Sequence, residues 1–197
     1  MSPSGTPTLL TERLELRPLE LADHEAIQRI FPRWEIVRLL AAGVPWPYPT
    51  DGALSFIRDS TMPAVNRGEE WAWTIRPRSK PSDLIGCISL FAKEGENRGY
   101  WLDPRWQRRG LMLEACNATS AFWFEQLGQS VLREYKAVEN EGSRRLSERQ
   151  NMRVVWRGSI QILTSIIFYL SHDHFVGRGG GILSPCHCEN ETIVSCT

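Results

Sequence analysis

The chain has 197 residues, of which 42% are hydrophobic and 23% are charged. This length suits one domain with an ordinary core and is short for two. The 23 basic residues balance the 23 acidic ones. A formal charge of zero argues against a general nucleic-acid binder, which needs a basic excess to neutralise phosphates.

The N-terminus lacks the basic and apolar regions of a signal peptide. The longest apolar stretch, Ile160 to Leu170, is much shorter than the ~20 residues of a membrane-spanning helix. We therefore expect a cytoplasmic protein that does not bind membranes. Five cysteines without a signal peptide give no indication of a disulfide framework.

Short strands and helices alternate in the first third of the chain. Residues 13–19 alternate leucines with charged residues, which predicts a half-buried strand. Asp23 stands where an N-cap belongs, before a helix over residues 24–31 that Pro32 limits. A proline-rich loop over residues 43–52 precedes a second expected helix.

Three strands are expected next, and their short connections favour an antiparallel meander; they cover residues 70–75, 84–91 and 97–102. From Leu111 the apolar spacing becomes helical, and Gly128 is a stop signal. The remaining elements are a strand over 131–138, a helix over 143–150 and a strand over 153–156. A helix joins the strands over 97–102 and 131–138, so these two should run parallel.

The composition changes abruptly after Gly158. Residues 159–197 contain few charged residues and have a glycine-rich centre. Ile160 to Leu170 is β-rich enough to supply one more strand, but it shows no alternation. The other interpretation is a tail that comes from an altered reading frame or splice and is disordered.

The tail also contains histidines and cysteines in close pairs: His172 with His174, and Cys186 with His187 and Cys188. Zinc ligands within one half-site are usually two to four residues apart, whereas these have one-residue spacing or less. We therefore expect no metal site.

Residues 101–116, "WLDPRWQRRGLMLEAC", join a strand end to a helix start. A helix N-terminus offers unpaired N–H groups and the positive end of a dipole, which together bind phosphate. Glycine permits close approach of the backbone, and arginine pairs with phosphate. The candidate phosphate contacts are Gln107, Arg108, Arg109, Gly110, Leu111 and Met112. On spacing alone, an ordinary solvated turn remains the alternative.

Three motifs in a fixed order carry a family resemblance: "TERLELRPL" (11–19), "GYWLDPRWQRRGLMLEA" (99–115) and "NEGSRRLSERQNMRVV" (140–155). They resemble the GNAT superfamily of acyl-CoA N-acyltransferases, in the Rim-type branch that acetylates ribosomal-protein N-termini and diverse amines. The resemblance implies an acetyltransferase domain over 11–158, after a flexible segment over 1–10 and before an atypical tail over 159–197.

The fold implied by the resemblance is α+β. Its central twisted sheet is mostly antiparallel, contains one splayed parallel strand pair and is flanked by about four helices. The implied function is transfer of an acetyl group from acetyl-CoA, as cosubstrate, to a primary amine by direct attack on the thioester. The amine would be a protein N-terminus or a small molecule. Homodimerisation stays open.

The resemblance also implies roles for individual residues. The strand end at Trp101, Leu102 and Asp103 would contact the pantetheine arm and the thioester, and Asn140 would contact the same arm. Ser143 would protonate the leaving thiolate, although capping of the following helix would also explain a serine there.

The phosphate loop departs from the family pattern at two positions. Gln107 and Gly110 match the pattern. Arg108 stands where many relatives have glycine, and Met112 replaces a small residue. This departure motivates the alternative of a degenerate acetyl-CoA-binding module without turnover. A third reading is a damaged product whose exposed sheet edge drives association.

The residues that complete the chemistry are less defined. Glu96, Asp103 or a water chain are candidates for the general base, which stays unassigned. Three aromatic residues, Trp46, Tyr48 and Trp71, are candidates to line an acceptor pocket, with core packing as the alternative.

Overall fold

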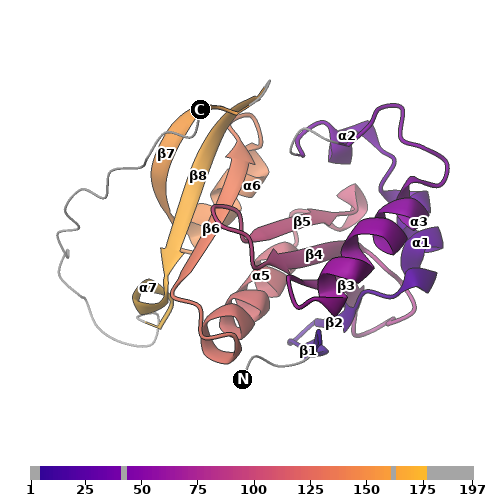
Figure 1. Cartoon of the computed structure of the whole chain (residues 1–197), viewed down its shortest axis with the longest axis horizontal. Helices are drawn as coiled ribbons and strands as arrows, with labels where there is room; N and C mark the ends of the chain where they lie inside the picture. Colours follow the sequence, from indigo (N-terminus) through magenta and orange to yellow (C-terminus); the bar gives the residue numbers. More distant parts are fainter. Residues whose placement is uncertain (1–4, 41–43, 161–162, 177–197) are drawn as a thin grey trace.

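The computed structural model describes residues 5–40, 44–160 and 163–176. Its strands form two sheets that lie side by side, with β5 next to β6 (Figure 1). The five-stranded antiparallel sheet has the order β1 (Leu9–Leu10), β2 (Leu14–Pro18), β3 (Glu70–Pro77), β4 (Gly86–Phe91) and β5 (Arg98–Leu102). The three-stranded sheet has the order β6 (Val131–Ala137), β8 (Leu163–Ser171) and β7 (Arg153–Ile160).

Most of the helical segments are short. Before β3 lie η1 (Leu21–Asp23), α1 (His24–Ile30), α2 (Trp34–Val37), α3 (Gly52–Phe56), the π-helical turn η2 (Ile57–Thr61) and α4 (Met62–Asn66). After β5 lie η3 (Pro104–Trp106), α5 (Leu111–Ala121), the π-helical turn η4 (Phe122–Gln126), α6 (Glu141–Arg149) and α7 (His172–Val176). Within the ranges described, no helix is long and apolar enough to cross a membrane.

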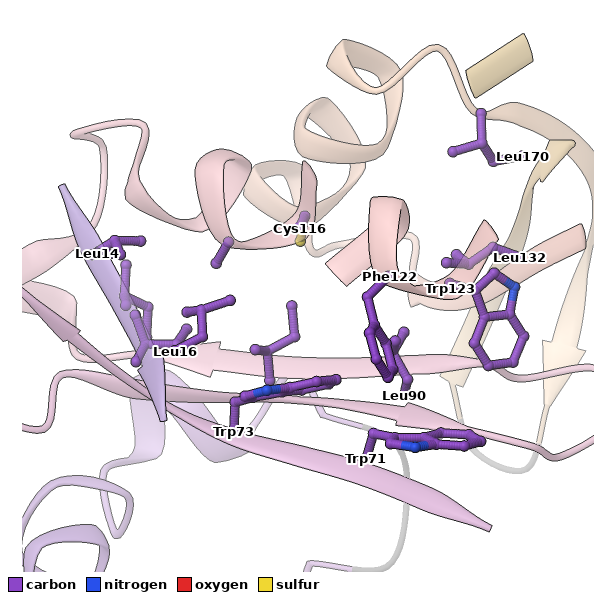
Figure 2. Close-up of a cluster of buried hydrophobic side chains, with 14 of the residues drawn as sticks. Leu14, Leu16, Trp71, Trp73, Leu90, Cys116, Phe122, Trp123, Leu132 and Leu170 are labelled. Atoms are coloured by element: carbon purple, nitrogen blue, oxygen red, sulfur yellow. The ribbon is translucent and has the colours of Figure 1, made fainter. Parts of the chain in front are cut away.

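The larger core lies between the five-stranded sheet and α5. Alternate residues of β3 and β4 point to that side, and Figure 2 shows Trp71, Trp73 and Leu90 there together with Phe122 and Trp123. Burial of one large apolar side chain stabilises the fold by ~1.5–3 kcal/mol. The opposite face of the sheet packs on α1 and α3 through a second, smaller core.

The strands β5 and β6 run parallel and separate early. The Asn97 N–H donates to the Arg133 carbonyl at 2.8 Å, and the Arg133 N–H donates to Asn97 Oδ1 at 2.8 Å. Further along, Arg98 contacts Glu134 and Tyr100 contacts Lys136, so the partners advance in the same direction along both strands. These later contacts join side chains, and the strands belong to separate sheets. The predicted splayed parallel pair is therefore confirmed.

Residue 158, where the resemblance places the end of the domain, lies inside β7, and the boundary stays a prediction. β8 follows and lies between β6 and β7, antiparallel to both (Figure 1). Ile166, Phe168 and Leu170 of β8 are buried in the larger core, whereas Ile167 and Tyr169 between them are half-buried. Because the half-buried positions also carry apolar or aromatic side chains, the sequence shows no two-residue period. The structure does not describe residues 177–197, so the expectations for the end of the tail, its cysteines included, lie outside the described residues.

Three expectations need correction. Leu9 and Leu10, placed in a flexible segment, pair with β2 as β1; residues 1–4 lie outside the described ranges. The Asp23 side chain does not cap α1, since it accepts from the Glu20 N–H at 2.9 Å and pairs with Arg76 at 2.6 Å. The second helix continues through the π-helical turn η2 into α4, neither of which the sequence pattern predicted.

Candidate active site

The loop before α5 is held in a left-handed backbone conformation at two positions. Gly110 is the N-cap of α5 with φ of +77°, and Arg108 has φ of +60°. L-residues other than glycine, asparagine and aspartate rarely adopt this region. The conformation therefore gives a physical reason for the glycine that the family resemblance led us to expect at position 108.

This loop presents backbone donors at a helix N-terminus. Residues 107–110 are exposed. In the part of the chain that the structure describes, the N–H groups of Arg108, Arg109, Leu111 and Met112 donate to no acceptor. Unpaired donors at the positive end of a helix dipole favour an anion. The residues present therefore fit a pyrophosphate group.

The two arginines of the loop are held differently. The Arg109 guanidinium lies over the Trp106 ring, 5.1 Å from its centre. The Arg109 carbonyl accepts from Arg13 at 3.0 Å. Arg108 extends from the strained position into solvent. Arg109 is thus held by a ring contact, whereas Arg108 is exposed next to the free backbone donors.

Arg13 also neutralises a carboxylate at the start of α5. Its guanidinium contacts Glu114 at 2.7 Å, and Thr11 donates to the same carboxylate at 2.5 Å. Burial works against ionisation, but these hydrogen bonds hold the pKa of Glu114 below its ordinary value. Sequence reasoning did not identify Arg13 as a site residue, although it lies in the first family motif.

The end of β5 has its own hydrogen-bonding pattern. The Asp103 N–H donates to the Ile85 carbonyl at 2.8 Å, and the Gln107 side chain donates to the Leu102 carbonyl at 3.0 Å. Bonding directions alternate along an antiparallel strand. The N–H and C=O groups of Arg98 and Tyr100 therefore point away from β4, toward the gap beside β6.

The predicted site residues Trp101 and Asp103 have partners on other elements. The Trp101 ring packs on Phe31, with ring centres 5.3 Å apart, on the α1 and α3 side of the sheet. The Asp103 carboxylate pairs with Arg33 at 3.2 Å and Arg105 at 2.6 Å. Burial opposes ionisation, but the hydrogen bonds from Arg105 hold the pKa of Asp103 below its usual value. This pairing does not favour Asp103 as the general base.

Two hydroxyl groups meet beside the β5–β6 gap. The Tyr100 and Ser143 hydroxyl oxygens are 2.8 Å apart. The N-cap of α6 is Asn140, whose Oδ1 accepts from the Ser143 N–H at 3.1 Å. Capping therefore occupies the Ser143 backbone and leaves its hydroxyl to Tyr100. Burial raises the pKa of Tyr100 to about 12, so this phenol carries its proton at neutral pH.

A buried charge cluster lies next to this hydroxyl pair. Glu134 pairs with Arg98, and its other oxygen is 3.0 Å from Lys136 Nζ. Lys136 Nζ also lies 4.1 Å from the centre of the Tyr100 ring. Burial opposes ionisation, but the charges of Arg98 and Lys136 lower the pKa of Glu134. Two cations and one carboxylate leave the cluster with a charge of +1.

A cavity of about 370 Å³ connects the hydroxyl pair with the opposite face of the sheet. Its polar lining includes Tyr100, Lys136, Asn140 and Ser143 from the gap, and Glu70, Ser89 and Glu96 from the other side. Its apolar wall includes Leu19, Ile27, Phe31, Tyr48, Phe56, Ile57 and Phe91. Its volume is within the range of small-molecule sites.

The three aromatic candidates for the acceptor pocket separate in the structure. Tyr48 lines the cavity. Trp46 is half exposed and packs on Trp34, with ring centres 5.1 Å apart. Trp71 is buried in the larger core. Among the residues described, no group of three or more histidine, cysteine or acidic side chains is arranged to hold a metal ion.

Sequence reasoning missed Glu70, Tyr100 and Lys136 as site residues. Tyr100 lies inside a quoted family motif. Glu70 and Lys136 are charged residues within predicted strands, and buried charges in strands are unusual enough to be a signal. Their partners depend on how strands that are distant in sequence pair with each other. The local sequence pattern does not contain that information.

The split strand pair, the phosphate-fitting helix start and the cavity that opens from the strand gap are the features of acyl-CoA-dependent N-acyltransferases. A family model described as "Acetyltransferase (GNAT) domain" matches residues 13–153, and the chain belongs to this family.

Individual acetyltransferases are also similar to this chain in sequence or in structure. A curated relative, the uncharacterized N-acetyltransferase YoaA of Bacillus subtilis, is 30% identical over 145 residues, covering 71% of this chain and 79% of that protein. A putative ribosomal-protein-serine acetyltransferase from Vibrio cholerae is 23% identical, with a TM-score of 0.68 over 87% of this chain and 99% of that one. The microcin C7 self-immunity acetyltransferase MccE, solved with acetyl-CoA and AMP, is 18% identical, with a TM-score of 0.68 over 85% and 98%.

Proposed function

We propose that this chain transfers the acetyl group of acetyl-CoA to a primary amine. The observation that carries the proposal is the combination of three features in one molecule. The free donors of residues 108–112 lie at the start of α5, the β5–β6 gap carries the Tyr100–Ser143 hydroxyl pair, and the cavity opens on the far side of the sheet.

The cosubstrate would bind to the first two of these features. The free amides and Arg108 would hold its pyrophosphate, as expected for a helix N-terminus. The backbone groups of Arg98 and Tyr100 that face the gap would bind its pantetheine arm, together with the Asn140 end of α6. The MccE complex, which contains acetyl-CoA in a similar fold, supports this choice of cosubstrate.

The reaction would be a direct displacement. The amine nitrogen attacks the thioester carbonyl carbon, a C–N bond forms, the C–S bond breaks, and the sulfur leaves as a thiolate. The Tyr100 N–H faces the gap and would stabilise the oxyanion of the tetrahedral intermediate. The amine proton passes to a carboxylate or water of the cavity, where Glu96 is the nearest carboxylate in sequence to the point at which the strands separate.

The leaving thiolate needs a proton, and the hydroxyl pair would supply it. Ser143 would donate to the sulfur and recover a proton from Tyr100, whose hydroxyl is 2.8 Å away. The charge of +1 on the neighbouring Arg98, Glu134 and Lys136 cluster would favour a developing negative charge nearby.

Two measurements on the purified chain test the proposal. The first is the thermal shift caused by acetyl-CoA, and the second is thiol release from acetyl-CoA in the presence of a panel of primary amines. A shift together with amine-dependent thiol release is the expected result. A shift without thiol release from any amine would instead indicate a binding module without turnover, which the substitution of Arg108 for glycine motivates.

A further inference from the structure

Glu70 is a buried carboxyl group that the proposed reaction does not use. It begins β3, is 8% exposed and lines the cavity. Because it alternates with Trp71, which faces α5, its side chain lies on the opposite face of the sheet. Its carboxyl group is hydrogen-bonded to Ser89.

Glu70 lacks a positively charged partner. Among the residues described, no basic side chain comes within ion-pair distance of it. The other charged groups of the cavity are satisfied, since Glu96 pairs with Lys93, and Arg98 and Lys136 share Glu134. An unpaired buried carboxylate is costly, and a cation brought by a ligand would remove that cost.

The position of Glu70 separates it from the reacting atoms. β4 lies between β3 and β5, and neighbouring strands are ~4.8 Å apart, so Glu70 is ~10 Å from the backbone of β5. The gap that would hold the thioester lies beyond β5. A nitrogen under attack on the thioester therefore lies more than two strand spacings from the Glu70 backbone.

The wall near Glu70 is mostly apolar. Ile57 and Phe91 line the cavity beside Thr61, and Phe91 is the direct cross-strand partner of Glu70. Ile57 and Thr61 belong to the π-helical turn η2, and such turns occur frequently at functional sites. An apolar chain would fit between Glu70 and the gap.

We propose that the acceptor of this enzyme carries two cationic groups joined by an apolar chain. One amine reaches the β5–β6 gap and is acetylated, while the second cation, an ammonium or guanidinium, binds Glu70. This inference rests on the proposed function, because it assigns the acceptor class of the same site.

The burial of Glu70 is consistent with this role. Burial raises its pKa to about 7, so a bound cation would favour the ionised form. The other titratable or charged groups that line the cavity are Tyr48, Cys87, Glu96, Arg98, Tyr100, Tyr135 and Lys136. Burial raises the pKa values of the Cys87 thiol and the Tyr48 phenol, and both therefore stay neutral near pH 7.

The test compares the binding of a diamine and a monoamine of equal length. Calorimetry at pH 8 with 1,8-diaminooctane and with octylamine, in the presence of free CoA, measures binding without turnover. We expect the diamine to bind about tenfold more tightly, the size of a hydrogen bond to a charged group. The preference should disappear in Glu70→Gln.

A neighbouring residue supplies the matched control. Glu69 is exposed and pairs with Arg67 at 2.7 Å, so Glu69→Gln should keep the diamine preference. Equal binding of both amines by the wild-type chain would overturn the inference, as would a preference that survives in Glu70→Gln. Equal loss of turnover with both amines in Glu70→Gln, at unchanged affinities, would make Glu70 a base and also overturn it.

These outcomes separate the inference from the proposed function. Diamine binding that depends on Glu70, without any acetylated product, would contradict only the enzymatic activity. Acetylation of octylamine without a diamine preference would contradict only the role of Glu70. The acetyl-CoA thermal shift, measured on both variants, shows that each is folded.

Discussion

The Tyr100 hydroxyl lies 2.8 Å from the Ser143 hydroxyl. A side chain of β5 and one of α6 therefore meet beside the gap between β5 and β6. The two residues are 43 positions apart in sequence. Burial raises the pKa of Tyr100 to about 12, and the Ser143 backbone is fixed by the Asn140 cap. The pair is therefore a proton donor of defined geometry.

Removal of either hydroxyl should slow the chemical step. In Tyr100→Phe and in Ser143→Ala, kcat should fall ~10- to 100-fold while acetyl-CoA affinity stays nearly constant, because general acid catalysis contributes ~10²–10⁴-fold. The double variant should lose little more than the worse single variant, since the two groups act as one relay. Steady-state kinetics and acetyl-CoA titration check this, with Ser55→Ala as the control, because the Ser55 hydroxyl donates to Asp51 at 3.1 Å and does not line the cavity. Additive losses would show that the hydroxyls act independently.

The left-handed conformation of Arg108 predicts opposite effects of two substitutions. Arg108→Val should destabilise the fold by ~1–2 kcal/mol, because a β-branched residue at φ of +60° is strained. Arg108→Gly should leave stability nearly unchanged, since relief of strain offsets the greater freedom of the unfolded chain. Urea unfolding measures both. Equal destabilisation by glycine and valine would contradict the assigned conformation.

Arg13 and Glu114 should be coupled in acetyl-CoA binding. Arg13→Gln leaves the Glu114 carboxylate without its guanidinium partner at the start of α5, where it would repel a phosphate. We expect acetyl-CoA affinity to fall about 10-fold. The double variant with Glu114→Gln should recover most of this loss. Isothermal titration of acetyl-CoA into the wild type, both single variants and the double variant measures this coupling. If the double variant does not regain affinity, Arg13 contacts the ligand directly.

The buried Glu134 should be essential to the stability of the strand junction. Glu134→Gln leaves Arg98 and Lys136 buried without a carboxylate, which we expect to cost ~3–5 kcal/mol. The sign of the pH effect follows from the lowered pKa of Glu134. Its stabilisation is present above the unfolded value of ~4.3 and is lost as pH falls through the lower folded value. The difference in unfolding free energy between wild type and variant should therefore be constant above about pH 5 and shrink as the pH falls from there toward the folded pKa of about 2.

Glu70 should have the opposite pH dependence. Its folded pKa of about 7 lies above the unfolded value of ~4.3. Below both pKa values the Glu70 carboxyl is protonated in the folded and in the unfolded chain. As the pH rises between the two values, the carboxyl ionises in the unfolded chain first, which lowers the free energy of unfolding. Glu70→Gln should therefore be more stable than wild type at pH 8, by on the order of 3 kcal/mol, and equal to it at pH 4. A variant less stable than wild type at pH 8 would contradict the unpaired state of Glu70.

Local patterns predicted the elements, whereas long-range contacts decided the site. The turn and helix start at Gly110 and the stop at Gly128 were readable because they depend on neighbouring residues. The contacts of Arg98 with Glu134 and of Tyr100 with Lys136 depend on how β5 lies against β6, and the contact of Tyr100 with Ser143 depends on how α6 follows β6. No local pattern contains either arrangement.

The segment after Gly158 also shows what a local sequence pattern cannot predict. β8 is the centre of its sheet, and both neighbours cover its edges. The burial of β8 does alternate, with Ile166, Phe168 and Leu170 buried, but the half-buried Ile167 and Tyr169 between them are also apolar or aromatic, so the sequence does not show the alternation. The sequence therefore offered two interpretations of Ile160 to Leu170, and only the strand pairing distinguished them.

The most direct test of the proposed acetyl transfer is mass spectrometry of 1,8-diaminooctane after incubation with the purified chain and acetyl-CoA, with free thiol measured in parallel. We expect a singly acetylated diamine that appears in equal amount to the released thiol and falls sharply with Tyr100→Phe. No acetylated amine from the diamine or from octylamine, in a chain that acetyl-CoA stabilises against heat, would contradict the proposed activity.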